Sequence, residues 1–253
     1  MTRETTMRIE APPSMVQLAT EALMRMLLGG TLRPGDRVVE NQLTQELGVS
    51  RPPLREAMRV LEQQGLITQL PRRGAFVTQL TLHDIYEIVT LRRELERMAV
   101  DLGVPVRSAA RLERCHAALH KHGEAAQAGD WLGVLERAVD FHSSVIGLSG
   151  HRRLEEAYRS IQFQMLLCMG MNRQARASDE SLVEDWHRHR RLLGVIEAGD
   201  PEEVHRELAA HGDMAFLDGI EDQVGGHSPE SLAWLHRLRK ESSGRIFRKE
   251  RNE

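Results

Sequence analysis

The segment from residue 32 to residue 78 constrains the fold most, because it carries turn and helix-end signals in a fixed order. Arg33-Pro34-Gly35-Asp36 predicts a turn that ends a preceding helix. A short helix is expected to begin near Glu40, with two leucines one turn apart on its inner face. Gly48 is expected to end this helix as a left-handed cap, and so to set the turn that follows.

A second helix is expected directly after Ser50, which is a good N-cap residue. Pro52 and Pro53 fall in its first turn, where proline costs little because no intrahelical N–H bond is lost there. Apolar residues then follow the i, i+3, i+4, i+7 spacing of one buried face. Arginines recur every fourth residue on another face, at Arg51, Arg55 and Arg59.

A β-hairpin is predicted after Gly65, with strands at residues 66–68 and 75–77 and a tight turn at residues 71–74. Its tip carries Arg72 and Arg73, which can reach phosphate or the minor groove of DNA. A regular arginine spacing alone is also typical of a solvated helix face. The ordered series of turn, caps, paired prolines and basic hairpin instead favours a winged helix-turn-helix with one helix in the major groove.

This segment resembles the winged-helix domain of GntR-type bacterial transcription regulators in PGDRVVENQL, LGVSRPPLREAMRVLEQQGLI and RRGAFV. The resemblance implies DNA contacts from the second helix and from the wing. Asn41 stands where the family often has a DNA-contacting arginine, so we expect a different operator preference. The residues predicted to contact DNA are Asn41, Ser50, Arg51, Arg55, Arg59, Arg72, Arg73 and Gly74.

The length of 253 residues suits two domains. We expect a DNA-binding domain at residues 14–80 and an all-α domain at residues 81–223, between a mobile tail at 1–13 and a C-terminal tail at 224–253. Residues 1–80 hold 10 Arg against 8 Asp plus Glu, a net +2, whereas the rest holds 24 basic and 29 acidic residues, a net −5. Such a local positive excess is enough for phosphate contacts, and the acidic part would be kept off DNA.

No apolar run approaches the roughly 18 residues that a membrane helix requires, so no membrane partner is expected. The first residues lack the apolar core of a signal peptide. Cys115 and Cys168 form neither a disulfide framework nor a paired metal motif, and we expect both in the core. These features favour a cytoplasmic protein.

Residues 82–223 show long helical periodicities separated by short loops, which predicts an antiparallel bundle of six or more helices and a mainly α fold. After Gly225-Gly226 we expect one short amphipathic helix, packed on the bundle or on a partner subunit through Leu232, Leu235 and Leu238, and then a disordered charged end. The predicted loops lie at residues 103–105, 129–130, 149–150, 175–178 and 199–201.

Three histidines lie on apolar stripes of separate predicted helices: His142, His189 and His211. One inward histidine is usually a hydrogen-bonded core residue, but three on separate helices indicate a shared site. Imidazoles that meet in a bundle suit Zn, Ni or another divalent first-row metal. We expect the other nine histidines mostly on flanks or loops, with His187 turned away from His189.

Arg92 lies on the apolar stripe of the first bundle helix, and a buried guanidinium needs an anion. One interpretation is an ion pair with a buried acidic side chain. The other is an anchor for the carboxylate of an effector, because the planar fork of donors matches a carboxylate.

The helical part resembles the FCD-type effector domain of the fatty-acid-regulator branch of GntR proteins, in LRRELERMAV, DFHSSVIGLSG and HRRLLGVIEAGD. The resemblance implies a divalent metal held by an Asp and three His beside a small organic acid. The three histidines match, and Arg92 matches an arginine often near the ligand, but Ala138 stands in the place of the Asp. Asp140 is two positions from His142 and should face elsewhere. Both a three-histidine metal site and loss of the metal stay open.

The sequence thus predicts a ligand-responsive transcription regulator, a repressor in most such families. It would bind a palindromic operator as a homodimer and take a small organic acid as effector. One alternative is a metalloenzyme that activates water on the three histidines, although the chain has no HExxH pair. Another is a non-specific architectural DNA protein, which the large acidic second domain disfavours.

Overall fold

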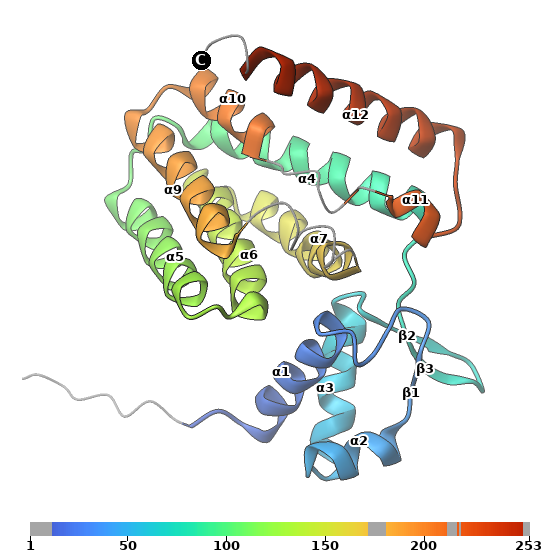
Figure 1. The fold of residues 1–253 in the computed structure, drawn as a ribbon. Helices are drawn as coiled ribbons and strands as arrows, with labels where there is room; N and C mark the ends of the chain where they lie inside the picture. Colours follow the sequence, from blue (N-terminus) through green and yellow to red (C-terminus); the bar gives the residue numbers. More distant parts are fainter. Residues whose placement is uncertain (1–11, 172–180, 212–216, 218, 250–253) are drawn as a thin grey trace, which may run out of the picture.

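The computed structural model describes residues 12–171, 181–211, 217 and 219–249, and it places a small N-terminal unit against one end of a helical bundle (Figure 1). The predicted mainly α fold, with a winged helix-turn-helix followed by a bundle, is confirmed. Most of the expected N-terminal tail, the loop at residues 175–178 and the last four residues lie outside the described residues.

The N-terminal unit contains α1 (Met15–Leu28), α2 (Glu40–Leu47) and α3 (Arg51–Gln63). Helix α1 begins at Ser14, whose side chain accepts from the backbone N–H of Gln17 while the Gln17 side chain accepts from the Ser14 N–H. Helix α2 begins at the predicted residue and ends at Gly48, whose φ of 64° is the expected left-handed cap. Helices α1 and α3 pack through leucines that are fully buried, including Leu23, Leu54 and Leu61.

The wing is a three-stranded antiparallel sheet of order β1-β3-β2, with β1 (Arg37–Val38), β2 (Ile67–Leu70) and β3 (Gly74–Val77). The predicted hairpin is present, but its first strand begins one residue later and runs two residues further than expected. Strand β1 was not predicted. Its two residues carry no readable alternation, and they form a strand only because Arg37 pairs with Phe76 and Val38 with Ala75.

The bundle consists of α4 (Leu82–Gly103), α5 (Ala109–Gln127), α6 (Trp131–Leu148), α7 (Arg152–Met171), α9 (Leu182–Ala198) and α10 (Pro201–His211), followed by the short α11 (Ile220–Gln223). The described helix ends agree with the expected loops at residues 103–105, 129–130, 149–150 and 199–201. None of the helices in the described ranges is long and apolar enough to cross a membrane.

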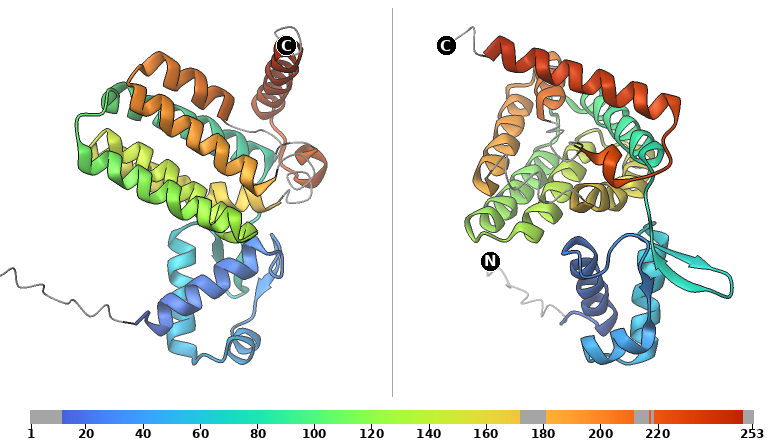
Figure 2. Two further views of the ribbon diagram at one scale, coloured as in Figure 1. Left: turned by 60° about the vertical axis from the view of Figure 1, so that its left-hand side comes forward. Right: turned by 45° about the vertical axis from the view of Figure 1, so that its right-hand side comes forward.

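The expectation of a short C-terminal helix was wrong, because α12 runs over 21 residues from Pro229 to Lys249. It lies along α4 of the same chain (Figure 2), where the rings of Trp234 and Tyr86 are 5.6 Å apart. Trp234, Leu235 and Leu238 are buried, but Leu232 is 46% exposed. Two of the three expected leucines are therefore buried, and Trp234, which offers a larger apolar surface, is buried in place of Leu232.

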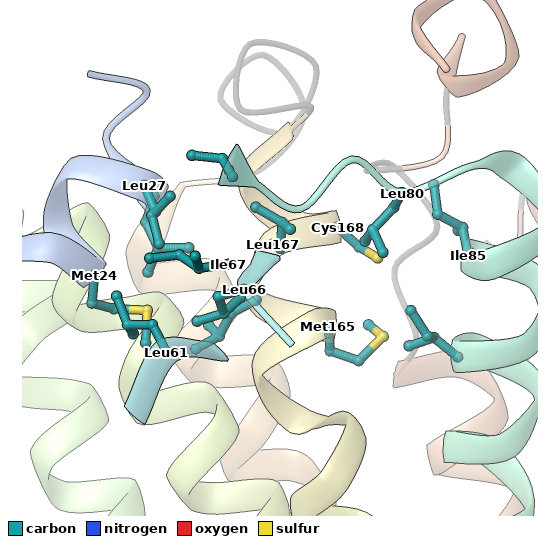
Figure 3. Close-up of a cluster of buried hydrophobic side chains, with 14 of the residues drawn as sticks. Met24, Leu27, Leu61, Leu66, Ile67, Leu80, Ile85, Met165, Leu167 and Cys168 are labelled. Carbon is teal, nitrogen blue, oxygen red and sulfur yellow. The ribbon is translucent and has the colours of Figure 1, made fainter. Parts of the chain in front are cut away.

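A continuous apolar core joins the winged helix to the bundle (Figure 3). Leu66 and Ile67 from the wing region belong to one buried cluster with Leu167 and Cys168 of α7. The cluster crosses the expected domain boundary near residue 80, so the two parts share packed side chains there rather than only a linker.

Candidate DNA-binding surface and effector cavity

Ser50 occupies the N-cap position of α3 with extended backbone angles of −75° and 162°, but its side chain caps no N–H group. A capping side chain accepts from the N–H of the second or third helical residue. In α3 these residues are Pro52 and Pro53, which have no N–H. The predicted N-cap position of Ser50 is thus confirmed, but its exposed side chain forms no capping hydrogen bond.

The exposed side of α3 carries the three predicted arginines, and each of them is paired with an acidic or amide side chain. An Arg51 N–H donates to Asn41 Oδ1 at 3.0 Å, and Arg55 Nε donates to Glu40 Oε2 at 2.9 Å. Arg59 pairs within α3 with Glu56 at 3.0 Å. Residues 40 and 41 of α2 thus orient the first two arginines, while the Arg55 side chain stays 61% exposed.

The wing tip has backbone angles that few residues adopt, with φ at 63° for Arg72 and 95° for Gly74. Arg73 is exposed and its guanidinium lies 5.7 Å from the ring centre of Phe76. Sequence reasoning missed the exposed Arg37, whose guanidinium lies 3.6 Å from where a Cβ on Gly74 would stand. Had strand β1 been predicted from the sequence, Arg37 would have been placed beside Arg72, Arg73 and Gly74 at the wing tip.

A cavity of about 60 Å³ lies in the bundle between α4, α6, α7, α9 and α10. A cavity that holds one water molecule has a volume of roughly 10–15 Å³, so this cavity has room for a few solvent molecules or a small ligand. Its wall includes the predicted Arg92 and the three predicted histidines.

The three histidines converge in the cavity: His142 from α6, His189 from α9 and His211 from α10. All are buried, with ring centres 5.3 Å apart for His142 and His189, 5.1 Å for His142 and His211, and 4.4 Å for His189 and His211. One ring nitrogen from each lies within 4.8 Å of the others. We call these three residues the triad.

The triad is in the chemical state that a metal requires. Burial, the largest cause in each case, lowers the pKa of all three imidazoles, and strongly so for His189 and His211, which keeps the rings neutral. His189 Nδ1 donates to the backbone carbonyl of Asp185 at 2.8 Å, so Nε2 carries the lone pair. Neither ring nitrogen of the buried His211 has a hydrogen-bond partner within the described ranges, which is costly unless a ligand or cation binds. The triad therefore fits a divalent metal.

No acid replaces the missing Asp at its expected position. Ala138 is buried and lines the cavity one turn before His142. Asp140 is exposed and pairs with Arg137 at 2.7 Å, so it faces away as expected.

Arg92 is paired with an acid that sequence reasoning missed. Its Nε donates to Glu96 Oε1 at 2.8 Å, one helical turn along α4. The same oxygen lies 3.0 Å from His142 Nδ1 and accepts from Tyr158 at 3.3 Å. Burial raises the Glu96 pKa, but the Arg92 charge and His142 outweigh it and bring it to about 2, so the carboxylate is ionised. The ion-pair interpretation of Arg92 is thus observed, and the i, i+4 spacing of Arg92 and Glu96 was the available signal.

Two further buried polar residues were missed, Asp185 on α9 and His122 on α5. His122 is an exception to the expectation that the other histidines lie mostly on flanks or loops, because it is 0% exposed. Asp185 lines the cavity and accepts from Arg188, three residues further along α9. His187 is only partly buried, and its ring lies 4.8 Å from the Trp186 ring at an angle of 32°.

Comparisons with known proteins agree with both parts of the chain. Residues 16–77 match the family model described as bacterial regulatory proteins, gntR family, and residues 87–214 match the FCD domain. The uncharacterized HTH-type transcriptional regulator YdhC of Bacillus subtilis is 30% identical over 196 residues, which covers 75% of this chain and 84% of YdhC. A probable D-xylose utilization operon transcriptional repressor of Paenarthrobacter nicotinovorans is 30% identical over 202 residues, covering 78% and 84% respectively.

Solved structures give the same result. A putative GntR transcriptional regulator from Rhodococcus sp. RHA1 superposes with a TM-score of 0.63 at 27% identity, covering 83% of this chain and 97% of that one. The similar proteins are named as transcription regulators, and nothing among them supports the metalloenzyme alternative.

Proposed function

The chain belongs to the GntR family of bacterial regulatory proteins and carries an FCD domain, and from that premise we propose that it represses transcription in response to a small organic acid. In this proposal a homodimer binds a palindromic operator in the cytoplasm. One observation carries this proposal: a helix with an exposed cationic face and a buried cavity lined by histidines and arginines lie in one molecule, connected by a shared apolar core. The repressor role is supported by the similar protein from Paenarthrobacter nicotinovorans, which is named a probable transcriptional repressor.

We assign the major-groove contacts to Ser50, Arg51 and Arg55, and the wing contacts to Arg72, Arg73 and Gly74. The exposed Ser50 hydroxyl caps nothing in α3 and so suits a phosphate or base. DNA would replace the Asn41 and Glu40 partners of the two arginines, and Asn41 would thereby influence operator choice. Arg59, paired with Glu56 two turns along the helix, would contact the backbone at the edge of the site.

The effector would occupy the cavity together with a divalent metal on the triad. The cavity wall includes three arginines, Arg92, Arg93 and Arg188, against two carboxylates, Glu96 and Asp185. A bound cation would add to this positive excess, which favours an anionic ligand. Because Glu96 already engages Arg92, the effector's carboxylate has to share or displace that pair.

Replacement of Arg55 by alanine tests the recognition-helix assignment. The side chain is largely exposed, so the folded structure should persist while specific operator affinity falls by about 1–3 kcal/mol, roughly 5- to 150-fold. Fluorescence anisotropy with an operator selected from random DNA, at one fixed salt concentration, measures the change. Arg153→Ala, on the exposed surface of α7, is the matched control and should bind as the unchanged protein does. Equal operator affinity for the Arg55 variant would show that α3 is wrongly assigned.

A further inference from the structure

A second group of side chains able to bind a metal lies beside the triad and shares one residue with it. His122 of α5 and Asp185 and His189 of α9 are all buried, and one ligand atom from each lies within 4.8 Å of the others. We call these residues the second cluster. His122 has no place in the effector cavity, so the proposed function does not account for it.

The distances in the second cluster suit a tetrahedral ion. His122 Nε2 lies 3.1 Å from Asp185 Oδ2, and His189 Nδ1 lies 3.6 Å from the same oxygen. With zinc bonds of about 2.0–2.1 Å, neighbouring tetrahedral ligands stand about 3.3 Å apart. These two separations lie on either side of that value, and a cation on His189 Nδ1 would take the place of the hydrogen bond from this nitrogen to the Asp185 carbonyl.

Helix packing forces His122 into this position. The next residue, Gly123, packs against Trp186 of α9 so closely that a Cβ would lie 2.8 Å from the indole nitrogen. The close approach brings His122 to the carboxylate of Asp185. Within the described ranges His122 Nε2 approaches the Asp185 carboxylate at 3.1 Å, but neither ring nitrogen makes a hydrogen bond of good geometry, which is unfavourable for a buried polar group. A cation bound to one nitrogen would remove part of that cost.

Asp185 has the outer support that ligating carboxylates usually have. Arg188 donates to Oδ1, whereas Oδ2 is the oxygen that faces His122 and His189. Hydrogen bonds of this kind orient a carboxylate and leave its other oxygen directed at the metal. The second cluster also contains the acidic ligand that the triad lacks at Ala138.

We propose that His122, Asp185 and His189 form a second divalent-cation site, for zinc or a similar first-row ion, that is an alternative to the triad. A neutral imidazole has one lone pair, so His189 serves the triad through Nε2 or the second cluster through Nδ1. Binding in the second cluster moves the His189 ring proton from Nδ1 to Nε2, and the chain holds one cation at a time. This inference concerns cation binding alone and does not depend on DNA recognition.

Cobalt titration of variants separates the two positions. His211→Gln disables the triad, and we expect that chain still to bind one Co²⁺, with the absorption of a four-coordinate ion. Adding His122→Gln should then weaken binding at least about tenfold. The matched control adds His120→Gln, an exposed residue one half-turn away on α5, and should leave the affinity unchanged. Asp185→Asn in the same background should also weaken binding, and circular dichroism checks that each chain is folded.

A cysteine replacement gives a readout that a purely structural role of His122 would not move. In the His211→Gln background, His122→Cys should add a thiolate-to-cobalt charge-transfer band that the parent chain lacks. Three results would each overturn the proposal: no Co²⁺ bound by folded His211→Gln, equal affinity with and without His122→Gln, or a folded cysteine variant that binds Co²⁺ without the band. Operator affinity, measured on the same chains, reports separately on the proposed function.

Discussion

Pro52 and Pro53 remove the only N–H groups that Ser50 is placed to cap, so the serine hydroxyl contributes little to the stability of α3. Serine at an N-cap usually stabilises a helix, and the sequence pattern correctly placed Ser50 at that position. The pattern alone could not show that the proline pair leaves the hydroxyl available for DNA.

We therefore expect Ser50→Ala to change the free energy of unfolding by less than about 0.5 kcal/mol, while operator affinity falls. Ser14→Ala is the matched control, because Ser14 Oγ accepts from Gln17 N at 3.2 Å in a complete capping box. That variant should lose about 1 kcal/mol of stability. Urea unfolding measures both variants, and an equal loss for the two serines would contradict this account of α3.

We expect residue 138 to influence the metal affinity proposed for the triad. Ala138→Asp places a carboxylate in the cavity wall one turn before His142, and we expect zinc affinity to rise at least about tenfold. Without metal the buried charge should lower the melting temperature, and zinc should restore it. Ala138→Asn, which has the same shape without the charge, is the control. Zinc competition titrations would refute the idea if both variants bound alike.

The triad was predictable because each histidine interrupts a clear apolar stripe. His122 was not, since its helix also carries His116 and His120 and the periodicity there is ambiguous. Its burial depends on the contact between Gly123 and Trp186, which are far apart in the sequence. Glu96 was missed for a related reason, because an acidic residue on a helix is normally solvent-exposed. The ion pair with Arg92 offsets the cost of burying its charge.

At the scale of elements, the crossing of α4 and α6 fixes the geometry of the cavity, because these helices carry Glu96 and His142. The two helix ends approach closely at Gly103, where a Cβ would lie 2.8 Å from the backbone carbon of Leu148 and 2.8 Å from the nitrogen of Ser149. Backbone atoms cannot rotate away as a flexible side chain can. The glycine therefore sets the distance between the two helix ends.

Gly103→Ala should destabilise the protein by about 1–3 kcal/mol through overpacking. The control is Gly194→Ala in α9, where a Cβ would meet nothing within 4 Å. Because glycine is a poor helix former, that change should stabilise the protein by up to about 1 kcal/mol. Denaturant unfolding measures the free energy of unfolding of both variants. If both substitutions changed it in the same direction, the close approach at Gly103 would not contribute to stability as argued.

The elements that sequence reasoning missed depend on contacts distant in the sequence. Strand β1 exists through its pairing with β3, and α12 packs against α4, more than 100 residues earlier in the chain. The long bundle helices, by contrast, were readable because each holds its own apolar periodicity over many turns.

At the scale of the whole molecule, α7 connects the cavity with the winged helix. Tyr158 and Met165 line the cavity, while Leu167 lies in the core that contains Ile67 of the wing. Gln164 of the same helix covers Gly65 at the end of α3, where its amide nitrogen lies 2.6 Å from the position of a Cβ. A ligand that moves α7 therefore changes contacts next to the recognition helix, which gives the proposed effector a physical route to the DNA-binding surface.

The proposed homodimer requires an apolar face, and α4 has one. Leu91, Met98 and Leu102 are 45%, 41% and 51% exposed, and their spacing puts them on one side of the helix over about 16 Å. Arg97, paired with Glu94 at 3.0 Å and Asp101 at 3.1 Å, borders this stripe with charge. An apolar centre with a polar rim is typical of interfaces between subunits, and a two-fold axis would bring the same stripe from both copies together.

We expect Met98→Glu together with Leu102→Glu to convert the dimer to a monomer, because four carboxylates would then meet in the apolar centre of the interface. Light scattering after size exclusion measures the mass, and operator affinity should fall with it because a monomer reads only one half-site. Leu232→Glu on α12 is the control, since that leucine is equally exposed at 46% but lies off the α4 stripe. A double variant that remains dimeric would place the subunit contact elsewhere, and a monomeric unchanged protein would contradict the dimer itself.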